Sequence, residues 1–591
     1  MTRSSKQDSN WETISRQKIA KRNSQIPTTW LISSELLPKD PPIKEYGTQN
    51  VVQLPRECGI LTSAEIEITE TTSVQSLLSM IASRKLSATD VTTAFCKRTA
   101  IAQQLTNCIT EPLFTAALER AKDLDEFLAR EGKVVGPLHG LPISMKDSFD
   151  IIGIDSSIGI ASLCFKPATS NSPLVGLLLS LGCIIISKTN IPQTLNSLDS
   201  VNNVFGRTMN PINRLCTAGG SSGGEGVLVA MRGCMVGWGG DTGGSIRVPA
   251  MCNGVFGIKQ SNGRVPAGGG PLISPDGISR CTIPAVVGPL ARSVDDIDYV
   301  MREVVPRAWK WGEDCFPGSW SLDSDFSGSG PHGEFVFGIL RGDGNCVPLP
   351  PMAKLLDEVK TKLKHFPNTT AIEVPTPPAW TKCQSVMAKL MGSDGGEVIL
   401  DLLEATGEPL VPWMVGKLKR SKPKTLHEVA ELQARRTKLE RGMMELWVEG
   451  DGKGGKRCRV DAIVCLIAPH PVPEIERYNA VGYTSSWTLL DYPAGTVPIR
   501  NFCEQDLELG QSLTGNAISS WDERNRQLWD EKTVDRRVYL GTPLSVQVVT
   551  PRLQDKRLIE AMRIVDDACM ERGPRLYGTE DIAASYSLKE I

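Results

Sequence analysis

The segment from Ala218 to Ala250, AGGSSGGEGVLVAMRGCMVGWGGDTGGSIRVPA, restricts the fold of this 591-residue chain more than any other feature. Eleven of its 33 residues are glycine, and it contains three serines, two acids and no histidine. Glycine in regular structure costs about 0.5–1 kcal/mol per position relative to alanine. A segment so rich in glycine therefore indicates that the bare backbone has to approach another group closely.

Composition limits the kind of protein that carries this segment. Hydrophobic residues make up 40% of the chain and the formal net charge is −2, which allows a large core and gives no basic field for nucleic acid. The longest apolar run, residues 174–187, is shorter than the ~18 residues of a transmembrane helix, and we expect a helix and a buried strand there. The N-terminus is polar and has no apolar signal-peptide core. We expect a soluble cytoplasmic protein with no transmembrane segment and no nucleic-acid partner.

Cysteine and histidine are placed in ways that argue against disulfides and metal sites. The 16 cysteines are scattered without a C-x-x-C pair, which indicates reduced, mostly buried thiols. Cys216 and Cys252 flank the glycine-rich segment, but neither has a histidine nearby in sequence, so we interpret both as structural. The five histidines have no zinc-binding spacing. We therefore predict no metal and no organic cofactor.

Apolar periodicity predicts helices in the first part of the chain. Residues 1–60 contain several prolines and should form an arm that is irregular or helical. Val74 to Ile81 form one apolar stripe, and the sequence SATD at Ser87 is a capping box that predicts the start of the next helix. A third stripe runs from Ala117 to Leu128. We expect these helices to cover a sheet.

Short apolar runs predict strands that alternate with the helices. The runs are LPISM at Leu141, GCIIISKTN at Gly182, and later FVFGIL, DAIVCLIAP and GTPLSVQVVT. This alternation is typical of an α/β sandwich with a largely buried sheet. We predict one domain over 61–591, with a core at about 70–300 and a C-terminal part at about 330–590 that completes the sheet and the substrate pocket.

Three motifs suggest other chemistries, but the evidence for each of them is weak. Residues 219–223 fit the G-x-S-x-G nucleophile elbow, which also needs a downstream acid and histidine; histidines do follow, but the pattern arises easily in Gly/Ser-rich sequence. DTGGS at Asp241 resembles an aspartic-protease loop, yet the chain has no second such loop to share a proton. Residues 450–455 fit G-x-G-x-x-G but follow an amphipathic helix instead of a strand.

Acyl transfer explains the glycines better. The backbone N–H groups of Thr242, Gly243, Gly244 and Ser245 could converge on the oxyanion of an attacked carbonyl, with Ser245 as nucleophile at the start of a helix. A serine needs a base, and with histidine scarce a buried neutral lysine is the alternative. Lys146 ends an apolar strand and fits this role. Ser221 or Ser222 could carry the proton between Lys146 and Ser245.

The chain resembles the amidase signature family. The stretches GPLHGLPISMKD, SKTNIPQ, GGSSGGEG, GGDTGGSIRVPA and GTPLSVQ occur in the family's order, and the resemblance spans about residues 70–570. Within the family, YTSSWTLLDYPAGTVPI and SIRVPA are most similar to the fungal acetamidase type, related to fatty acid amide hydrolase. The resemblance implies the amidase-signature fold, a central mixed β-sheet sandwiched by α-helices.

The resemblance also implies the roles of individual residues. The catalytic triad would be Lys146, Ser221 and the nucleophile Ser245, with a cis peptide between Gly220 and Ser221. Ser222 would support the site by hydrogen bonds. Asp241 and Arg247 would form an ion pair that braces the loop, with a surface pair as the alternative for each.

The implied activity is hydrolysis of a carboxylic acid amide to an acid and ammonia or an amine, through an acyl-enzyme. The alternatives are an ammonia-generating subunit of an amidotransferase and an acyltransferase that tailors a specialised metabolite. The substrate is a small-molecule amide whose identity the sequence does not give, and a homodimer stays open. Aromatic and loop residues near Phe205, Trp413 and Tyr483 are candidates for substrate specificity.

Overall fold

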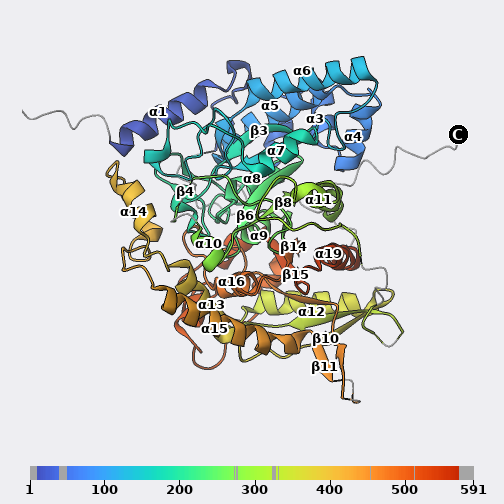
Figure 1. The fold of residues 1–591 in the computed structure, drawn as a ribbon, viewed down its shortest axis with the longest axis vertical. Helices are drawn as coiled ribbons and strands as arrows, with labels where there is room; N and C mark the ends of the chain where they lie inside the picture. The colour runs from blue at the N-terminus through green and yellow to red at the C-terminus, as the bar shows by residue number, and fades with distance from the viewer. Residues whose placement is uncertain are drawn as a thin grey trace, which may run out of the picture.

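The computed structural model describes residues 10–38 and 50–570, apart from 272, 275–276, 323–327, 331, 451, 453 and 511–512. Its centre is a mixed sheet of 11 strands in the order β1-β3-β2-β6-β8-β7-β14-β15-β13-β9-β10. Helices flank this sheet, so the predicted α/β fold is confirmed (Figure 1). The strands of the sheet are β1 Ile109–Pro112, β2 Pro142–Lys146, β3 Ile184–Thr189, β6 Val236–Asp241, β7 Phe256–Lys259, β8 Val286–Ala291, β9 Phe335–Leu340, β10 Thr369–Glu373, β13 Ala462–Leu466, β14 Ala494–Asn501 and β15 Pro543–Val549.

The helices of the first half surround the N-terminal strands. In Figure 1, α1, α5 and α6 lie at one end of the molecule and α12, α13 and α15 at the other, with β6, β8 and β14 between them. Helix α6 packs on β3, and α8 packs on β6. The helices up to residue 308 are α1 Trp11–Ser24, α2 Leu54–Glu57, α3 Ser63–Thr69, α4 Val74–Ala82, α5 Ala88–Thr106, α6 Phe114–Glu131, α7 Pro173–Ser180, α8 Gly223–Ala230, α9 Arg247–Asn253, α10 Ile278–Cys281 and α11 Val294–Ala308.

The helices of the second half pack on the C-terminal strands. Helix α12 packs on β10, and α19 packs on β14. Two small two-stranded ladders complete the secondary structure, β4 Val201–Asn202 with β5 Gly206–Arg207 and β11 Val448–Gly450 with β12 Lys456–Cys458. The remaining helices are α12 Pro350–His365, α13 Trp380–Met391, α14 Glu397–Glu404, α15 Leu426–Met443, α16 Gly482–Leu489, α17 Glu504–Leu507, α18 Ser520–Arg526 and α19 Asp555–Cys569.

The predicted N-terminal arm contains the helix α1, which is tied to the body by buried polar contacts. The Asn10 side chain accepts from the Glu12 N–H and starts the helix. Lys18 is 1% exposed and contacts the carboxylates of Glu111 and Asp155, with 2.5 Å between its Nζ and Asp155 Oδ2. The arm is therefore anchored by charge inside the fold.

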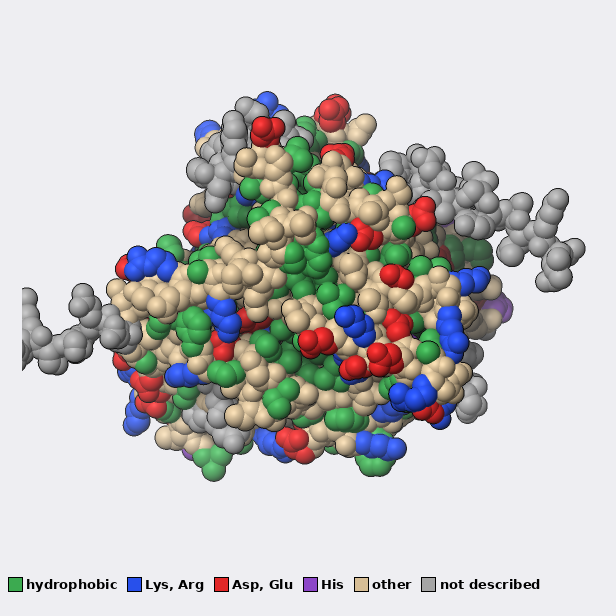
Figure 2. All heavy atoms as spheres, turned by 90° about the horizontal axis from the view of Figure 1, so that it is seen from above, with side chains coloured by type: hydrophobic (Ala, Val, Ile, Leu, Met, Phe, Trp, Pro, Cys, Tyr) green, Lys and Arg blue, Asp and Glu red, His purple; other side chains and the backbone are tan. Residues whose placement is uncertain are grey.

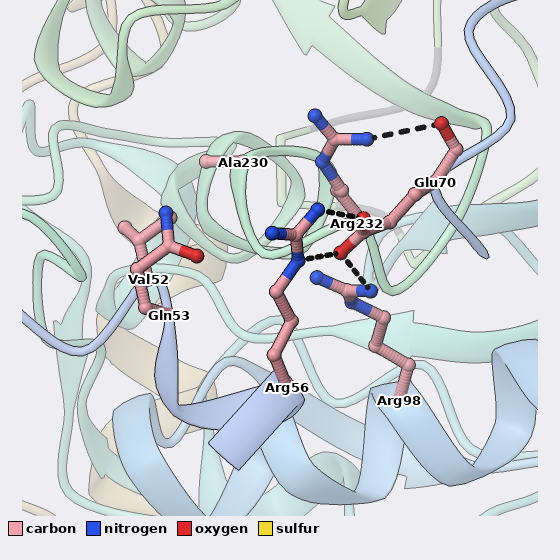
Figure 3. Close-up of a pocket in the computed structure, with 7 residues that line it drawn as sticks. All are labelled: Val52, Gln53, Arg56, Glu70, Arg98, Ala230 and Arg232. Carbon is pink, nitrogen blue, oxygen red and sulfur yellow. Dashed lines mark hydrogen bonds and ion pairs between the residues drawn. The ribbon is translucent and has the colours of Figure 1, made fainter. Parts of the chain in front are cut away.

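A second cluster of charges holds the short helix α2. The Glu70 carboxylate contacts Arg56 on α2 and Arg98 on α5, and the Glu70 carbonyl accepts from Arg232 (Figure 3).

Figure 2 shows the face seen from above, where basic and acidic side chains are interspersed. Among the described residues, no helix is both long enough and apolar enough to cross a membrane.

The helices predicted from apolar stripes and caps are confirmed. Helix α4 buries Val74, Leu77, Leu78 and Ile81, the four residues of the first stripe. Helix α5 begins after Ser87, whose side chain accepts from the Asp90 N–H. Helix α6 buries the apolar side of the third stripe. Local pattern and capping chemistry were sufficient signals for these elements.

The late strands join the same sheet, as predicted. Strands β9 and β13 pair in parallel, and β15 pairs antiparallel with both β13 and β14. Strand β14 also pairs with β7, so it joins the C-terminal strands to those formed before residue 300. The apolar-run analysis did not identify β6, β7, β8 or β14, which lie in the middle of the sheet.

Candidate active site

The candidate base, Lys146, is the last residue of β2, between β3 and β6 in the sheet. Its Nζ lies 2.7 Å from Ser221 Oγ and 3.3 Å from the Gly240 carbonyl oxygen. No carboxylate of the described residues forms an ion pair with it. Burial lowers the pKa of Lys146 to about 7, although the charges of Asp241 and Glu225 oppose this. A substantial neutral fraction at physiological pH follows from this pKa.

The serine pair lies between Lys146 and the following loop. The Gly220–Ser221 peptide is cis. A Cβ atom on Gly220 would lie 2.6 Å from the Ser197 carbonyl oxygen, so only glycine fits there. Ser222 precedes α8, and its N–H donates to the Ser245 carbonyl at 3.1 Å. This backbone contact holds the Ser221 turn against the loop that carries Ser245.

The loop from Asp241 to Ser245 connects β6 to α9 and is organised by one carboxylate. Asp241 Oδ1 accepts from the Gly244 N–H at 2.7 Å, and its Oδ2 accepts from the Ile246 N–H at 3.1 Å. In this structure the Gly244 amide thus donates to Asp241, and the expectation that it serves an oxyanion stays a prediction. The N–H groups of Thr242, Gly243 and Ser245 have no acceptor among the residues the structure describes.

The Asp241–Arg247 pair is buried and not a surface pair. Both side chains are 0% exposed, and the guanidinium contacts the carboxylate through Nε and Nη2, each at 3.0 Å. Arg247 also donates to the Thr484 carbonyl at 3.1 Å and to Thr488 Oγ1 at 3.0 Å. Burial disfavours the Asp241 carboxylate, but Arg247 outweighs this and holds the Asp241 pKa below its ordinary value. The pair fixes the loop onto α16.

Ser245 is the most open of the three predicted triad residues. It is 8% exposed, against 3% for Lys146 and 2% for Ser221. Within the described part of the chain, its hydroxyl makes no hydrogen bond. The structure thus brings Lys146 and Ser221 into contact and ties Ser222 to Ser245 through the backbone.

Thr484 is a site residue that the residue-by-residue analysis missed. Its Oγ1 donates to the Gly243 carbonyl at 2.6 Å. Gly244 has φ +129°, and a Cβ there would lie 2.4 Å from Thr484 Oγ1. Thr484 therefore sets the position of the loop from across the fold. The sequence analysis used the segment from Tyr483 for the family resemblance and for substrate specificity, and gave Thr484 no role of its own.

Glu225 is the second missed residue. It lies in the first turn of α8, is 0% exposed, and accepts from the hydroxyls of Ser144 and Thr189, the latter at 2.7 Å. Burial raises the pKa of Glu225 to about 8, so this carboxyl is largely protonated at neutral pH. The sequence signal that could have identified Glu225 is its position as a single acid in the otherwise apolar stretch GGEGVLVA.

The aromatic residues considered for specificity have other surroundings. Trp487 is 0% exposed and packs edge-on against Trp380, with ring centroids 4.5 Å apart, so it belongs to the core. Trp413 lies under Lys417, whose Nζ is 3.2 Å from the ring centroid.

No group of three His, Cys, Asp or Glu side chains in the described ranges could hold a metal ion.

The chain was compared with known families and proteins. The family model described as "Amidase" matches residues 90–559. The chain is 33% identical to "Acetamidase" of Emericella nidulans over 558 residues, which covers 93% of this chain and 96% of that protein. It is 33% identical to "Acetamidase" of Aspergillus oryzae, covering 93% and 97%. A solved structure of "Fatty acid amide hydrolase" has a TM-score of 0.81 and 28% identity, with 95% of each chain covered.

Proposed function

Because the chain belongs to the amidase family and is a hydrolase of amide carbon–nitrogen bonds, we propose that Lys146, Ser221 and Ser245 are its catalytic triad. The observation that carries the proposal is the 2.7 Å contact between Lys146 Nζ and Ser221 Oγ. It joins a buried lysine without a carboxylate partner to a hydroxyl that is held next to the Ser245 loop.

The first half of the cycle forms an acyl-enzyme. Neutral Lys146 accepts the proton of Ser221 while Ser221 accepts the proton of Ser245, whose Oγ attacks the amide carbonyl carbon. The N–H groups of Thr242, Gly243 and Ser245 donate to the developing oxyanion, and such a donor contributes about 2.7–4 kcal/mol. The Gly244 N–H has a different role, since its bond to Asp241 holds the other three amides in place.

The second half returns the enzyme to its starting state. The proton taken up by Lys146 passes through Ser221 to the leaving nitrogen, so that ammonia or an amine departs when the C–N bond breaks. A water molecule then gives its proton to the same relay and attacks the acyl carbon. The ester bond to Ser245 breaks, Ser245 regains its proton, and a carboxylic acid is released.

Purified variants test the triad. Ser245→Ala and Lys146→Ala should each lower kcat/KM for acetamide and for longer straight-chain amides by at least about 10³-fold. Ser486→Ala is the matched control, because Ser486 is buried on α16 and its hydroxyl donates to the Gly482 carbonyl of the same helix. Labelling by a fluorophosphonate should occur in the control and disappear in Ser245→Ala. Near-normal turnover by either triad variant would contradict the proposal.

A further inference from the structure

A second cavity lies outside the candidate active site, at the C-terminal end of α15. Its volume is about 570 Å³, within the range of about 300–1,000 Å³ that is typical of small-molecule sites. Neither Lys146, Ser221 nor Ser245 lines it. Helix α16 connects the two regions, because it contains Thr484 in its first turn and ends at Leu489, three residues before the cavity residue Tyr492.

The floor of the cavity is apolar and aromatic. Trp447, Val460 and Tyr492 are buried, and the rings of Trp447 and Tyr492 lie 5.3 Å apart between centroids. Met444 and Pro551 extend this surface toward the opening, where Met444 is 45% exposed. A hydrocarbon group in the cavity would be removed from water on this side, which favours binding by about 25 cal/mol per Å² of buried apolar surface.

The rim of the cavity is basic. Three arginines and one glutamate line it, which gives a net charge of +2. Glu440 forms an ion pair with Arg436, with 3.3 Å between Oε1 and Nε, and accepts a hydrogen bond from Arg552 at 3.4 Å, so its charge is already compensated. The Arg441 side chain has no ion-pair or hydrogen-bond partner among the described residues. The rim therefore offers one unpaired guanidinium to an anionic ligand.

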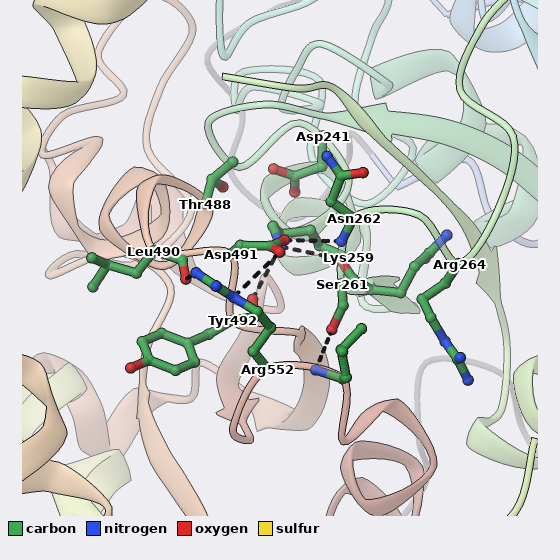
Figure 4. A network of polar contacts seen from close by, with 12 residues as sticks. Asp241, Lys259, Ser261, Asn262, Arg264, Thr488, Leu490, Asp491, Tyr492 and Arg552 are labelled. Atoms are coloured by element: carbon green, nitrogen blue, oxygen red, sulfur yellow. Dashed lines mark hydrogen bonds and ion pairs between the residues drawn. The ribbon is translucent and has the colours of Figure 1, made fainter. Parts of the chain in front are cut away.

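Arg552 is fixed behind this rim by the main chain at the end of α16. Its Nη2 donates to the Leu490 carbonyl at 2.9 Å, and its Nε lies 3.4 Å from Asp491 Oδ2 (Figure 4). Asp491 in turn accepts from the Asn262 N–H at 2.9 Å and lies 4.0 Å from the buried Lys259. The wall is thus held by bonds from several segments and does not depend on a ligand for its shape.

We propose that this cavity is a binding site for a free carboxylate with an apolar body, separate from the candidate active site. Arg441 holds the carboxylate at the rim, and the aromatic floor accepts the hydrocarbon part. The positive rim disfavours a cationic ligand with the same tail, and the apolar floor gives little affinity to a short acid. The proposal does not depend on the triad, since none of its residues is shared.

Calorimetric binding of decanoate to the full chain tests the site. We expect one decanoate site that Arg441→Gln weakens about tenfold, the effect of losing one charge-assisted contact. Arg435→Gln, an exposed arginine of the same helix that does not line the cavity, should bind decanoate like the unmodified protein. Decyltrimethylammonium and acetate should bind far more weakly than decanoate.

A filling variant gives an independent measurement. Met444→Trp adds bulk at the exposed opening, so it should abolish this binding while the melting temperature stays close to that of the unmodified protein. The proposal is overturned if the unmodified chain does not bind decanoate, or if binding is equal in Arg441→Gln and Arg435→Gln. The proposal is also overturned if decanoate binding is unaffected by both Arg441→Gln and Met444→Trp, because the ligand then binds outside the cavity.

Discussion

Two buried lysines of this protein have opposite surroundings. Lys18, on α1, contacts the carboxylates of Glu111 and Asp155, and these outweigh its burial and raise its pKa above the ordinary value. Lys146, on β2, donates to a hydroxyl and a carbonyl and contacts no carboxylate of the part of the chain that the structure describes, and burial lowers its pKa to about 7. Both side chains are almost inaccessible to water. The comparison teaches that the absence of a carboxylate, rather than burial, distinguishes a lysine that can act as a base.

The residue next to Lys146 shows how a carboxylate is kept away from it. Asp147 follows Lys146 in sequence, but its Oδ1 lies 3.1 Å from Lys188 Nζ and its Oδ2 accepts from Ser157. Asp147 lies in the turn that follows β2 and its carboxylate contacts Lys188 and Ser157, so adjacency in the sequence does not bring the charges of Lys146 and Asp147 together. The predictions that follow test the contrast between Lys18 and Lys146.

The largest effect is expected from Lys18→Met, measured by denaturant unfolding. The variant leaves the buried carboxylates of Glu111 and Asp155 unpaired, which should lower the free energy of unfolding by about 3–5 kcal/mol. Lys21→Met, at an exposed position of the same helix, should change it little. Neutralising both acids in the Lys18→Met background should recover much of the loss. An unchanged midpoint for Lys18→Met would mean that the ion cluster does not anchor α1.

Gly240→Asp would give Lys146 the partner that Lys18 has. A Cβ on Gly240 would lie 4.0 Å from Lys146 Nζ and 3.9 Å from the Val286 carbonyl oxygen, which are ordinary contacts. A carboxylate there should raise the pKa of Lys146 and lower kcat/KM at pH 7 by about 100-fold. Gly240→Asn, of similar size and no charge, is the matched control and should retain most activity. Equal losses in the two variants would attribute the effect to size.

The pH dependence of amide hydrolysis should follow the neutral form of Lys146. Because its pKa is about 7, kcat/KM should fall about tenfold for each pH unit below 7 and level off above it. In Gly240→Asp the pH below which kcat/KM falls should be higher, because the charged form of Lys146 is then favoured. A profile of the unmodified protein that is flat between pH 5 and 8 would contradict Lys146 as the base.

The smallest effect concerns stability. The folded state lowers the pKa of Lys146 from 10.5, so the unfolded chain binds the extra proton between about pH 7 and 10.5. The resulting destabilisation is complete below pH 7 and disappears as the pH rises toward 10.5. Lys146→Met should therefore abolish activity yet raise the free energy of unfolding at pH 7 by about 1 kcal/mol. If Lys146→Met instead lowered the free energy of unfolding by several kcal/mol, as expected for Lys18→Met, the proposed difference between the two lysines would be contradicted.

The sequence was sufficient for elements whose signal is local. The stripe at Val74 and the cap at Ser87 define α4 and α5, and the apolar runs define β3, β9, β13 and β15. Strand β6, with the sequence VGWGGD, was missed because its glycines indicate a turn in isolation. It forms a strand because β2 and β8 pair with it on both sides. Tertiary pairing overrides the local preference there.

The candidate site also contains some residues that the sequence could predict and others that it could not. The family motifs predict roles for Lys146 and Ser221, and in the structure Lys146 Nζ donates to Ser221 Oγ at 2.7 Å. The Gly244 amide and Thr484 were not predictable from spacing, since one depends on how the Asp241 carboxylate turns and the other on a contact between residues 241 positions apart. Such contacts depend on the assembled fold rather than on a pattern within one segment.

The position of β14 affects how the chain can be synthesised and handled. Strand β7 is complete by residue 259, yet one of its two partners, β14, begins only at residue 494. During translation the amino-terminal half therefore carries an open strand edge until more than two hundred further residues have left the ribosome. We expect that half, expressed alone, to aggregate, and co-expression with the missing half to rescue it.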